Sequence, residues 1–542
     1  MARPVPARLA IRDLDLSIGD ASILQGVSFD VAAGEAVGLV GESGSGKSLT
    51  ALSAIGLLPP GSRTSGSIRL DGEELLSLSE HGWQDLRGDR IGFVFQEPMT
   101  ALNPMHRAVD QVAETVLLHR DMPREQAREI AIAQFGRVGL SAGLAERYPH
   151  QLSGGQRQRV VIAIATVLGP DLVIADEPTT ALDVVRQREV LDLLRSLVHE
   201  DGTSLVLISH DLAVVAETAE HVVVMRGGRV VDRSRTVDLL RDERPDYTRQ
   251  LVAATTSAVR PVPAPIDAAP VLELRNVSRH YGGGFLGGPP LLAVDDVSLA
   301  VPRGGAVGLV GGSGCGKSTL ARVALMLDRP ATGSVLLDGT PIETLSDRAL
   351  LPYRRMMQIV FQDPGGSFDP QRTVGWSIAE PLHMLRDLTP KDRRTRVAEA
   401  IERVRLSPAD AGRYPHEFSG GQRQRLAIAR AIVAGPKLIV ADEAVSALDV
   451  SVRGHVLELL ATLREELGIA LLFISHDLGV VRAVTTEVAV MDAGRIVEHG
   501  ATERVLGHPE HPVTRSLLDA MPNLERAVAA RQASIHPSTG TA

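Results

Sequence analysis

Short runs of apolar residues alternate along the chain with longer segments in which apolar residues recur every three or four positions. The runs at 36–41 (AVGLVG), 172–176 (LVIAD) and 204–209 (SLVLIS) are dominated by Val, Ile, Leu and Ala, whereas 187–200 (QREVLDLLRSLVHE) has the spacing of an amphipathic helix. Runs that are apolar on both faces suit strands of a buried parallel sheet, whose faces are covered by helices. The pattern therefore predicts an α/β fold.

The whole pattern occurs twice in the chain. The stretch SGGQRQR occupies 153–159 and again 419–425, and each copy lies between closely similar neighbours. The other matched pairs are GESGSGKS at 41–48 with GGSGCGKS at 311–318, LVIADE at 172–177 with LIVADE at 438–443, and LISHDL at 207–212 with FISHDL at 473–478. With 542 residues the chain is also too long for one hydrophobic core. The sequence is a tandem duplication of one α/β domain.

The repeat sets the expected domain boundaries. We expect a first domain at 1–254 and a second at 271–521. The segment between them, 255–270, is rich in Pro and Ala and reads as a semi-rigid linker. Residues 522–542 are expected to form a flexible tail. Changes in spacing between the copies predict an insertion in YGGGFLGGPPLL (281–292) and a deletion between the second phosphate loop and Gln362.

Composition excludes several classes of protein. The chain is 44% hydrophobic and 23% charged, which is ordinary for a globular protein, and its formal net charge of -9 argues against binding a nucleic-acid backbone. Its uncharged runs are too short to span a bilayer, and its first residues lack the apolar middle of a secretory signal, so we expect the protein in the cytoplasm. The single cysteine, Cys315, excludes an intramolecular disulfide and a cluster held by four cysteines of this chain.

Two glycine-rich stretches carry the first chemical signal. Both fit GxxxxGK[ST] and follow an apolar run, the strand, loop and helix context that a phosphate-binding loop requires. Their backbone N–H groups and the positive end of the next helix attract phosphate, the lysine reaches the β- and γ-phosphates, and the last serine binds Mg²⁺. The residues expected at the phosphates are Gly41, Ser43, Gly44, Gly46, Lys47 and Ser48, and in the second copy Gly311, Ser313, Gly314, Gly316, Lys317 and Ser318.

Hydrolysis also needs a carboxylate for the metal and a group that orients water. Asp176 ends an apolar strand and Glu177 follows it, and neighbours on an extended chain point to opposite sides. We expect Asp176 to hold Mg²⁺ and Glu177 to polarise the attacking water, with Asp442 and Glu443 as their second copies. An isolated Asp-Glu pair after a strand is more often a helix cap, but the repeat and the phosphate loops favour catalysis.

Four further polar residues follow apolar runs on the same expected edge of the sheet. His210 and His476 are placed to hydrogen-bond a γ-phosphate and set the water, although a histidine at a strand end is usually structural. Gln96 and Gln362 are placed to contact the metal or the water, and the alternative for both is an ordinary turn. Together with the glutamates they complete the expected catalytic group.

This order of motifs resembles the nucleotide-binding domains of ABC ATPases over nearly the whole chain, twice. LSGGQ at 152–156 and FSGGQ at 418–422 look like the family signature. The resemblance implies two tandem P-loop ABC ATPase domains, each a mostly parallel sheet flanked by helices with a helical subdomain, that bind ATP and Mg²⁺. It implies that the signature of each domain completes the ATP site of the other. The signature residues so implied are Ser153, Gly155 and Gln156 at the Lys317 site and Ser419, Gly421 and Gln422 at the Lys47 site. From the residues alone, a helix-capping turn is the better hypothesis.

A narrower resemblance is to the ATPases of dipeptide, oligopeptide, nickel and glutathione importers. It is carried by FQEPMTALNP (95–104), FQDPGGSFDP (361–370), YPHQLSGGQRQR (148–159), YPHEFSGGQRQR (414–425) and HPVTRSLLDAMP (511–522). It implies an importer subunit for peptides or a related small solute, coupled to two transmembrane permease subunits and an extracytoplasmic solute-binding protein. Such a subunit lies on the cytoplasmic face of the cell membrane, held there by the permeases.

The chain departs from that family in two ways. The aromatic residue that stacks on adenine is matched by Tyr281, but the first half has Ile18, which predicts weaker nucleotide binding at the Lys47 site. Many peptide-importer relatives bind an iron-sulfur cluster through C-terminal cysteines, and one cysteine cannot, so we expect none. Cys315 matches Ser45 of the first loop and is expected to be a small filler, although a helix N-terminus could lower its pKa.

The surface that grips the permeases is expected after the two glutamines. Met99, Leu102 and Phe368 lie there among prolines and are expected to be exposed. The alternative function is a soluble ABC ATPase that acts on ribosomes or nucleic acid. A long charged linker, a basic arm or zinc-binding cysteines would favour it, and the Pro/Ala-rich linker, the negative charge and the single cysteine disfavour it.

Overall fold

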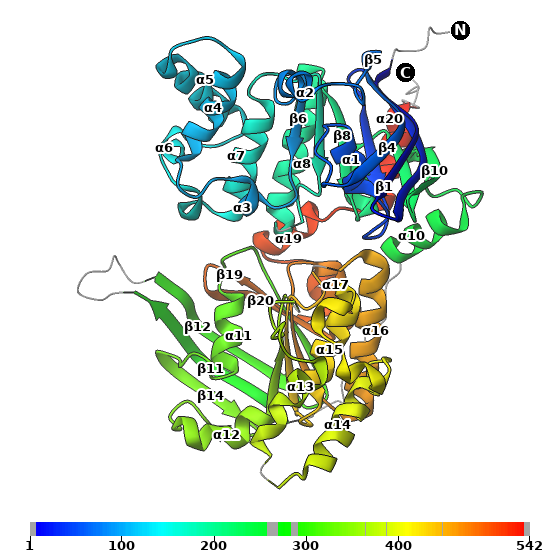
Figure 1. Cartoon of the computed structure of the whole chain (residues 1–542). Coiled ribbons are helices and arrows are strands. Elements are labelled where there is room, and N and C mark those ends of the chain that lie inside the picture. The colour runs from blue at the N-terminus through cyan, green and yellow to red at the C-terminus, as the bar shows by residue number, and fades with distance from the viewer. Residues whose placement is uncertain are drawn as a thin grey trace, which may run out of the picture. The chain divides into compact units, whose positions relative to one another are not determined.

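The computed structural model resolves the chain into two compact units, shown in Figure 1. The structure describes residues 7–180, 182–256, 269–282, 291–363, 365–385, 387–446 and 448–535. Most of the expected linker and most of the expected insertion lie outside these residues. Unit 1 comprises Met1–Leu182, Arg186–Ser257 and Pro522–Ala542, and unit 2 comprises Asp183–Val185 and Ala258–Met521.

Unit 1 contains two sheets. The larger sheet is parallel except at one edge, where its last two strands are antiparallel. Its strands, in spatial order, are β10 (Arg229–Arg235), β9 (His221–Arg226), β3 (Ala36–Val40), β8 (Ser204–Ser209), β7 (Leu172–Asp176) and β6 (Ile91–Val94). The smaller, antiparallel sheet is ordered β2 (Ala21–Ala32), β1 (Ala7–Ile18), β4 (Ser62–Leu70) and β5 (Glu73–Glu74).

The central strands of the larger sheet are buried on both faces, as their apolar runs predict. All five residues of β3 are buried. Ala36 and Val40 pack with the helices in one core, whereas Val37 and Leu39 pack with the antiparallel sheet in another. Side chains of successive strand residues point to opposite faces, so a strand between two cores must be apolar throughout. The prediction of a mostly parallel α/β domain flanked by helices is confirmed.

The helices of unit 1 either cover the larger sheet or form a separate helical group between β6 and β7. That group contains α3 (Pro98–Ala101), α4 (Ala108–His119), α5 (Arg124–Arg137), α6 (Ala142–Ala145), η1 (Pro149–Gln151) and α7 (Gly154–Thr166). The other helices are α1 (Lys47–Ser53), α2 (Glu80–Leu86), α8 (Val184–Asp201), α9 (Leu212–Thr218), η2 (Thr236–Asp238), α10 (Asp246–Thr256) and α20 (Leu524–Ile535).

Unit 2 repeats this plan. Its larger sheet is ordered β16 (Met357–Val360), β17 (Leu438–Asp442), β18 (Ala470–Ile474), β13 (Ala306–Val310), β19 (Glu487–Asp492) and β20 (Arg495–Ala501). Its smaller sheet is ordered β12 (Leu291–Pro302), β11 (Pro270–Tyr281), β14 (Thr332–Leu337) and β15 (Thr340–Pro341). Strand β14 has six residues where β4 has nine, so part of the expected deletion shortens a strand as well as a loop.

Most helices of unit 2 correspond to helices of unit 1. Those between β16 and β17 are α13 (Val374–Ala379), η3 (Glu380–Met384), α14 (Pro390–Arg403), η4 (Pro408–Gly412), η5 (Pro415–Glu417) and α15 (Gly420–Ile432). The others are α11 (Lys317–Ala324), α12 (Asp347–Met356), α16 (Val450–Leu467), α17 (Leu478–Val484), α18 (Thr502–Gly507) and α19 (Pro512–Ala520). Within the described residues, no helix is both long and apolar enough to cross a membrane.

The C-terminal segment differs from the expected flexible tail. Residues 524–535 form α20, which belongs to unit 1 although it follows unit 2 in the chain. Leu524, Ala527 and Val528 are buried in the core of unit 1 that also contains α9. In Figure 1, α20 is the red helix among the blue and green elements of unit 1. Apolar residues at positions 524, 527 and 528 share one face of a helix, and burial of that face holds the segment in place.

Two of the residues expected at an exposed surface are core residues. Leu102 is 2% exposed and Phe368 is 4% exposed, so the expectation of exposure is wrong for both. The Phe368 ring is also covered by the Arg430 guanidinium, 5.0 Å from its centroid. Met99 is exposed as expected. All three residues have prolines nearby in the sequence. The local backbone turn decides whether each apolar side chain is buried or exposed.

Replacing Phe368 with Ala should therefore lower the free energy of unfolding of unit 2 by about 3 kcal/mol or more, because the lost ring leaves a cavity. The chain has two tryptophans, Trp83 in unit 1 and Trp376 in unit 2. Urea unfolding followed by fluorescence in a Trp83→Phe background thus reports on unit 2. Leu327→Ala is the matched control, since Leu327 is exposed and its loss should change the stability by at most about 0.5 kcal/mol. Equal effects of the two substitutions would contradict the burial of Phe368.

Candidate functional site

The phosphate loop of unit 1 connects β3 to α1 and is shaped by glycines. Gly41 has φ 154°, and a Cβ there would lie 2.2 Å from the Met225 carbonyl oxygen of β9, so no other residue fits without moving the backbone. Lys47 is 5% exposed, and its Nζ donates to the carbonyl oxygens of Gly41 at 2.7 Å and Glu42 at 3.0 Å. The lysine thus curls back over the loop, where its charge faces the space that the backbone N–H groups surround.

The phosphate loop of unit 2 has the same geometry. Gly311 would place a Cβ 2.2 Å from the Met491 carbonyl oxygen, and Lys317 donates to the carbonyl oxygens of Gly311 and Gly312, both at 2.8 Å. Cys315 is buried beneath this loop, and that burial raises the pKa of its thiol. The cysteine is therefore a packing residue in the position of Ser45, because burial outweighs the charge and backbone N–H of Lys317 at the start of α11, which lower the pKa.

The two carboxylates of each unit separate at the end of a buried strand. Strand β7 ends at Asp176, and Glu177 has a φ of 46°, in the left-handed region that residues other than glycine rarely adopt. Glu443 repeats this conformation with a φ of 49°. We expected the alternation of an extended strand to separate the side chains, but a strained turn does so instead. Such strain persists only where the surrounding structure holds it, and it is common at active sites.

The expected catalytic side chains of unit 1 come together around Glu177. Gln96 Nε2 donates to Glu177 Oε2 at 3.2 Å, and His210 Nδ1 lies 3.2 Å from Glu177 Oε1. Thr180 also donates its hydroxyl to Glu177 Oε2 at 2.9 Å. Burial alone would raise the pKa of Glu177, but the hydrogen bonds and charge of His210, with Thr180 and Lys47, bring the pKa below its ordinary value. Glu177 is therefore an ionised carboxylate at neutral pH.

Unit 2 brings the corresponding side chains together in the same way. Gln362 Nε2 donates to Glu443 Oε2 at 2.8 Å, and His476 Nδ1 lies 3.2 Å from Glu443 Oε1. Burial opposes ionisation here too, and the hydrogen bond and charge of His476 with the charge of Lys317 outweigh it, so the pKa of Glu443 is also lowered. Both units thus hold a charged base beside a histidine and a glutamine, although these residues come from three separate strand ends.

The pKa values of the neighbouring aspartates shift in the opposite direction, upward. Burial and the charge of the adjacent glutamate raise the pKa of Asp176 and of Asp442, while Ser48 and Ser318 respectively lower it by hydrogen bonding. Ser318 Oγ donates to Asp442 Oδ1 at 3.5 Å. Asp176 Oδ1 is buried and has no hydrogen-bond partner among the residues that the structure describes. A buried carboxylate oxygen without a donor, beside a serine hydroxyl, suits a hard cation with oxygen ligands such as Mg²⁺.

Protein side chains alone do not form a closed metal site. No group of three or more His, Cys, Asp or Glu among the described residues could hold an ion. Mg²⁺ commonly takes one or two protein ligands and completes its shell with water and substrate phosphates. The residues present therefore fit Mg²⁺ bound together with a nucleotide, with Ser48 and Asp176 in unit 1 and Ser318 and Asp442 in unit 2.

The two signature stretches begin long helices. Ser153 caps α7: its Oγ accepts from the Gln156 N–H at 3.4 Å, and Gln156 Oε1 accepts from the Ser153 N–H at 2.9 Å. Ser419 and Gln422 form the same capping box on α15. Ser153 and Ser419 are exposed. The hypothesis of a helix-capping turn thus describes the local structure, and it leaves an exposed hydroxyl at the positive end of a helix dipole.

The two positions expected at adenine differ as the sequence indicates. Ile18 ends β1 and Tyr281 ends β11, so both lie at the same place in the small sheet of their unit. The Tyr281 hydroxyl donates to Asp328 Oδ2 at 2.7 Å, and the Arg279 guanidinium lies 4.9 Å from the ring centroid. Tyr281 is therefore held in a fixed orientation, and Ile18 has no aromatic face to offer.

One residue that contacts the first phosphate loop was not predicted from the sequence. Tyr247 of α10 is buried, and its hydroxyl accepts from the Glu42 N–H at 3.1 Å. The Arg226 guanidinium lies 4.7 Å from the Tyr247 ring and 3.6 Å from Glu42 Oε1. The corresponding residue of the second copy is Val513, which cannot make this bond. The presence of Tyr247 in one copy and Val513 at the matched position of the other was the signal that could have identified Tyr247.

Comparison with known proteins agrees with this geometry. The ABC transporter family model matches residues 24–180 and 294–446. The glutathione import ATP-binding protein GsiA of Escherichia coli (strain K12) is 42% identical over 93% of this chain and 87% of its own length. The peptidoglycan transport ATP-binding protein YejF of Agrobacterium fabrum (strain C58) is 42% identical over 95% of this chain and 97% of its own length.

Among solved structures, a dimeric ATP-binding cassette bound to ADP and Pi is 30% identical, with a TM-score of 0.39, and covers 43% of this chain and 98% of its own. The two matches of the family model each run from the small sheet, through the phosphate loop and the signature, to just beyond Glu177 or Glu443. With two such copies and relatives similar over nearly its whole length, the chain belongs to the ABC transporter family.

Proposed function

We propose that this protein is the ATP-hydrolysing subunit of an ABC importer that takes up peptides or a related small solute. The observation that carries the proposal is the full set of catalytic groups in each unit, where a lysine-bearing phosphate loop, two carboxylates, a glutamine and a histidine recur with matching contacts. The names of the two relatives, one for glutathione import and one for peptidoglycan transport, support the solute class.

The residues of unit 1 divide the work of hydrolysis. Lys47 and the loop N–H groups hold the β- and γ-phosphates, and Ser48 with Asp176 would hold Mg²⁺, which would supply positive charge to offset the charge of the phosphates. Glu177 accepts a proton from the attacking water, and its lowered pKa keeps it ready to do so. The catalytic roles of Lys317, Ser318, Asp442 and Glu443 in unit 2 are the same.

The histidine and glutamine position the water and the γ-phosphate. His210 and His476 each contact one oxygen of the glutamate, while Gln96 and Gln362 contact the other. A carboxylate held from both sides keeps one orientation, which lowers the cost of aligning water for attack. Gln96 and Gln362 follow strands β6 and β16, which lead into the helical group of each unit. They therefore connect the catalytic base to that helical group.

Each signature completes the ATP site of the other unit. Ser153, Gly155 and Gln156 serve the Lys317 site, and Ser419, Gly421 and Gln422 serve the Lys47 site. A γ-phosphate is a stronger acceptor than a neutral group, so an exposed serine hydroxyl and the N–H groups at a helix start gain more from it than from the 3.4 Å capping bond. ATP then draws the two units together, and hydrolysis releases them.

The partners are two transmembrane permease subunits, with an extracytoplasmic solute-binding protein in the full complex. The protein therefore works at the cytoplasmic face of the cell membrane, as a peripheral subunit. Met99 stays a candidate for the permease contact, and Met105 takes the place of the buried Leu102 and Phe368; the two methionines are exposed by 57% and 78%. Methionine adapts its shape easily, which suits a contact that must persist while the units move.

Proteins that copurify with the chain test the proposal most directly. We expect affinity purification from detergent-solubilised membranes to recover two integral membrane permeases in stoichiometric amounts. A Met105→Glu variant should recover less of them, whereas Leu118→Glu, equally exposed on α4, should recover the normal amount. Recovery of ribosomal proteins or nucleic acid in place of permeases would contradict the importer function.

Replacing the catalytic glutamates should separate binding from hydrolysis. Glu177→Gln or Glu443→Gln removes the base but keeps the side chain's shape, so the ATPase rate should fall by about 100-fold or more while ATP stays bound through gel filtration. Exposed Glu97, next to Gln96, provides the control, and Glu97→Gln should hydrolyse ATP normally. Normal turnover in both glutamate variants would exclude these residues as bases.

The two sites should also differ in nucleotide affinity. Aromatic stacking on a base contributes about 1 to 3 kcal/mol, so the Lys317 site with Tyr281 should bind ATP about 5-fold to 150-fold more tightly than the Lys47 site with Ile18. Lys47→Ala and Lys317→Ala variants isolate each site for titration with a fluorescent ATP analogue. Tyr281→Ile should remove the difference and Ile18→Tyr should reduce it. Equal affinities in the two single-lysine variants would exclude a role for stacking.

A further inference from the structure

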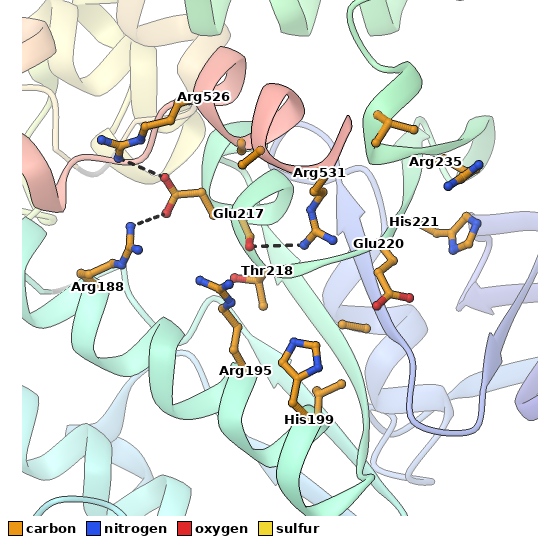
Figure 2. A pocket seen from close by; sticks show the side chains of 15 residues that line it. Arg188, Arg195, His199, Glu217, Thr218, Glu220, His221, Arg235, Arg526 and Arg531 are labelled. Carbon is orange, nitrogen blue, oxygen red and sulfur yellow. Dashed lines mark hydrogen bonds and ion pairs between the residues drawn. The ribbon is translucent and has the colours of Figure 1, made fainter. Parts of the chain in front are cut away.

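A cavity of about 590 Å³ lies in unit 1 between α8, α9, the start of β9 and α20. Its volume is within the range of about 300 to 1,000 Å³ that small-molecule sites occupy. Figure 2 shows its lining, with Arg195 and His199 projecting from α8 and Arg531 projecting from α20 on the opposite side. None of the ATP-site residues lines it.

The cavity is rich in positive charge. Five arginines line it, together with His199, His221 and two glutamates. The arginines are Arg188, Arg195, Arg235, Arg526 and Arg531. His221 Nδ1 contacts Glu35, and the hydrogen bond and charge of Glu35 raise the pKa of His221, which favours its charged form. The chain as a whole carries a formal net charge of -9, so this local excess of cations is opposite to the overall charge.

One of the two glutamates, Glu217, already pairs with nearby donors. The Glu217 side chain is 9% exposed, and its Oε2 lies 3.2 Å from Arg188 Nη1 while its Oε1 accepts from the Asn523 N–H at 3.2 Å. Arg526 lies 3.5 Å from the same Oε1. Figure 2 shows the two arginines on either side of this carboxylate. Glu217 therefore pins the start of α20 to α8 and α9, and its charge is already shared between Arg188 and Arg526.

The remaining cations face one another across the cavity. The Arg531 Nε and Nη2 donate to the carbonyl oxygens of Ala216 at 3.0 Å and Glu217 at 3.3 Å, which are neutral acceptors at the end of α9. Burial lowers the pKa of Arg531, the charge of Glu220 raises it, and the smaller effect of the Arg195 charge lowers it, so Glu220 offsets part of the repulsion between the two arginines. Arg195 has a contact of 3.5 Å with Asp192 on its own helix. Like charges brought together in a partly buried space are costly unless an anion joins them.

We propose that this cavity binds a small molecule with two or more negative charges, held between Arg195 and His199 of α8 and Arg531 of α20, and that the bound anion keeps α20 docked on unit 1. The shared chemistry is an oxyanion with several acceptor oxygens, which arginine recognises through paired N–H donors. A phosphate ester and a polycarboxylate both have it. The cavity is lined by none of the ATP-site residues, so the anion binds at a place separate from the ATP sites of unit 1.

Docking of α20 depends on few apolar contacts, so a ligand can influence it. The apolar residues that α20 buries in the core of unit 1 are Leu524, Ala527 and Val528, and two of its further contacts to that unit are made by Arg531 and by Gln532, whose Nε2 donates to the Val237 carbonyl oxygen at 3.2 Å. A short helix with a small apolar face gains a modest free energy from burial. An anion that joins Arg531 to Arg195 adds charge-assisted hydrogen bonds across the same boundary.

Calorimetric titration with pyrophosphate and with citrate tests the site. The phosphate loops also bind pyrophosphate, so the full chain should carry Lys47→Ala and Lys317→Ala. At low ionic strength, we expect one saturable site per chain for at least one probe, and Arg195→Glu should weaken it at least tenfold. The matched control is Arg124→Glu, a surface arginine of α5 in the same unit, which should bind normally. The tighter of the two probes distinguishes a phosphate ester from a polycarboxylate.

Hydrogen exchange of the amides in α20 localises the effect. The probe that binds should slow exchange across 524–535, and Arg195→Glu should remove this protection while leaving the thermal stability of unit 1 unchanged. Absence of saturable binding by both probes would overturn the proposal. Equal binding by the Arg195→Glu chain, or protection confined to the phosphate loops, would overturn it as well.

Discussion

Two adjacent carboxylates at the end of a buried strand are the constraint on which each unit depends. Side by side in a low-dielectric interior, both cannot be ionised without compensation. The protein resolves this by turning the backbone at Glu177 and Glu443 into the left-handed region, which separates each pair. The glutamate meets His and Gln and stays charged, while the aspartate remains beside the phosphate loop with an unsatisfied oxygen in unit 1. The open oxygen beside the Ser48 hydroxyl suits a hard cation with oxygen ligands.

The two units share this arrangement of carboxylates but differ in residues near it. Unit 1 has Ile18 where unit 2 has Tyr281, and it has Tyr247 on its phosphate loop where unit 2 has Val513. The first difference is expected to weaken binding of the adenine base, and the second adds a hydrogen bond between α10 and the first phosphate loop. A duplication fixes the shared chemistry in both copies, and each copy can then adjust how it recognises or releases nucleotide without losing the catalytic groups.

Much of this site could be predicted from the sequence because strand ends gather in space. Residues that follow parallel strands meet at one edge of a sheet, so Gln96, Glu177 and His210 could be brought together from their positions alone. The directions of single side chains could not be predicted from the sequence. The prolines around Leu102 and Phe368 suggest an exposed loop, whereas local turns bury both residues. Tyr247 was missed because nothing in its own helix points to a loop far away in the sequence.

The return of α20 to unit 1 has a consequence for how the protein can be divided. Cutting the chain in the segment between the domains would give a first fragment that lacks its last helix and a second fragment that carries it. The first fragment would expose the apolar surface that Leu524 and Val528 cover, and the freed carboxylate of Glu217 would lose its donor from the Asn523 backbone. The two products would thus be complementary pieces, because the second would carry a helix whose apolar face is buried on the first.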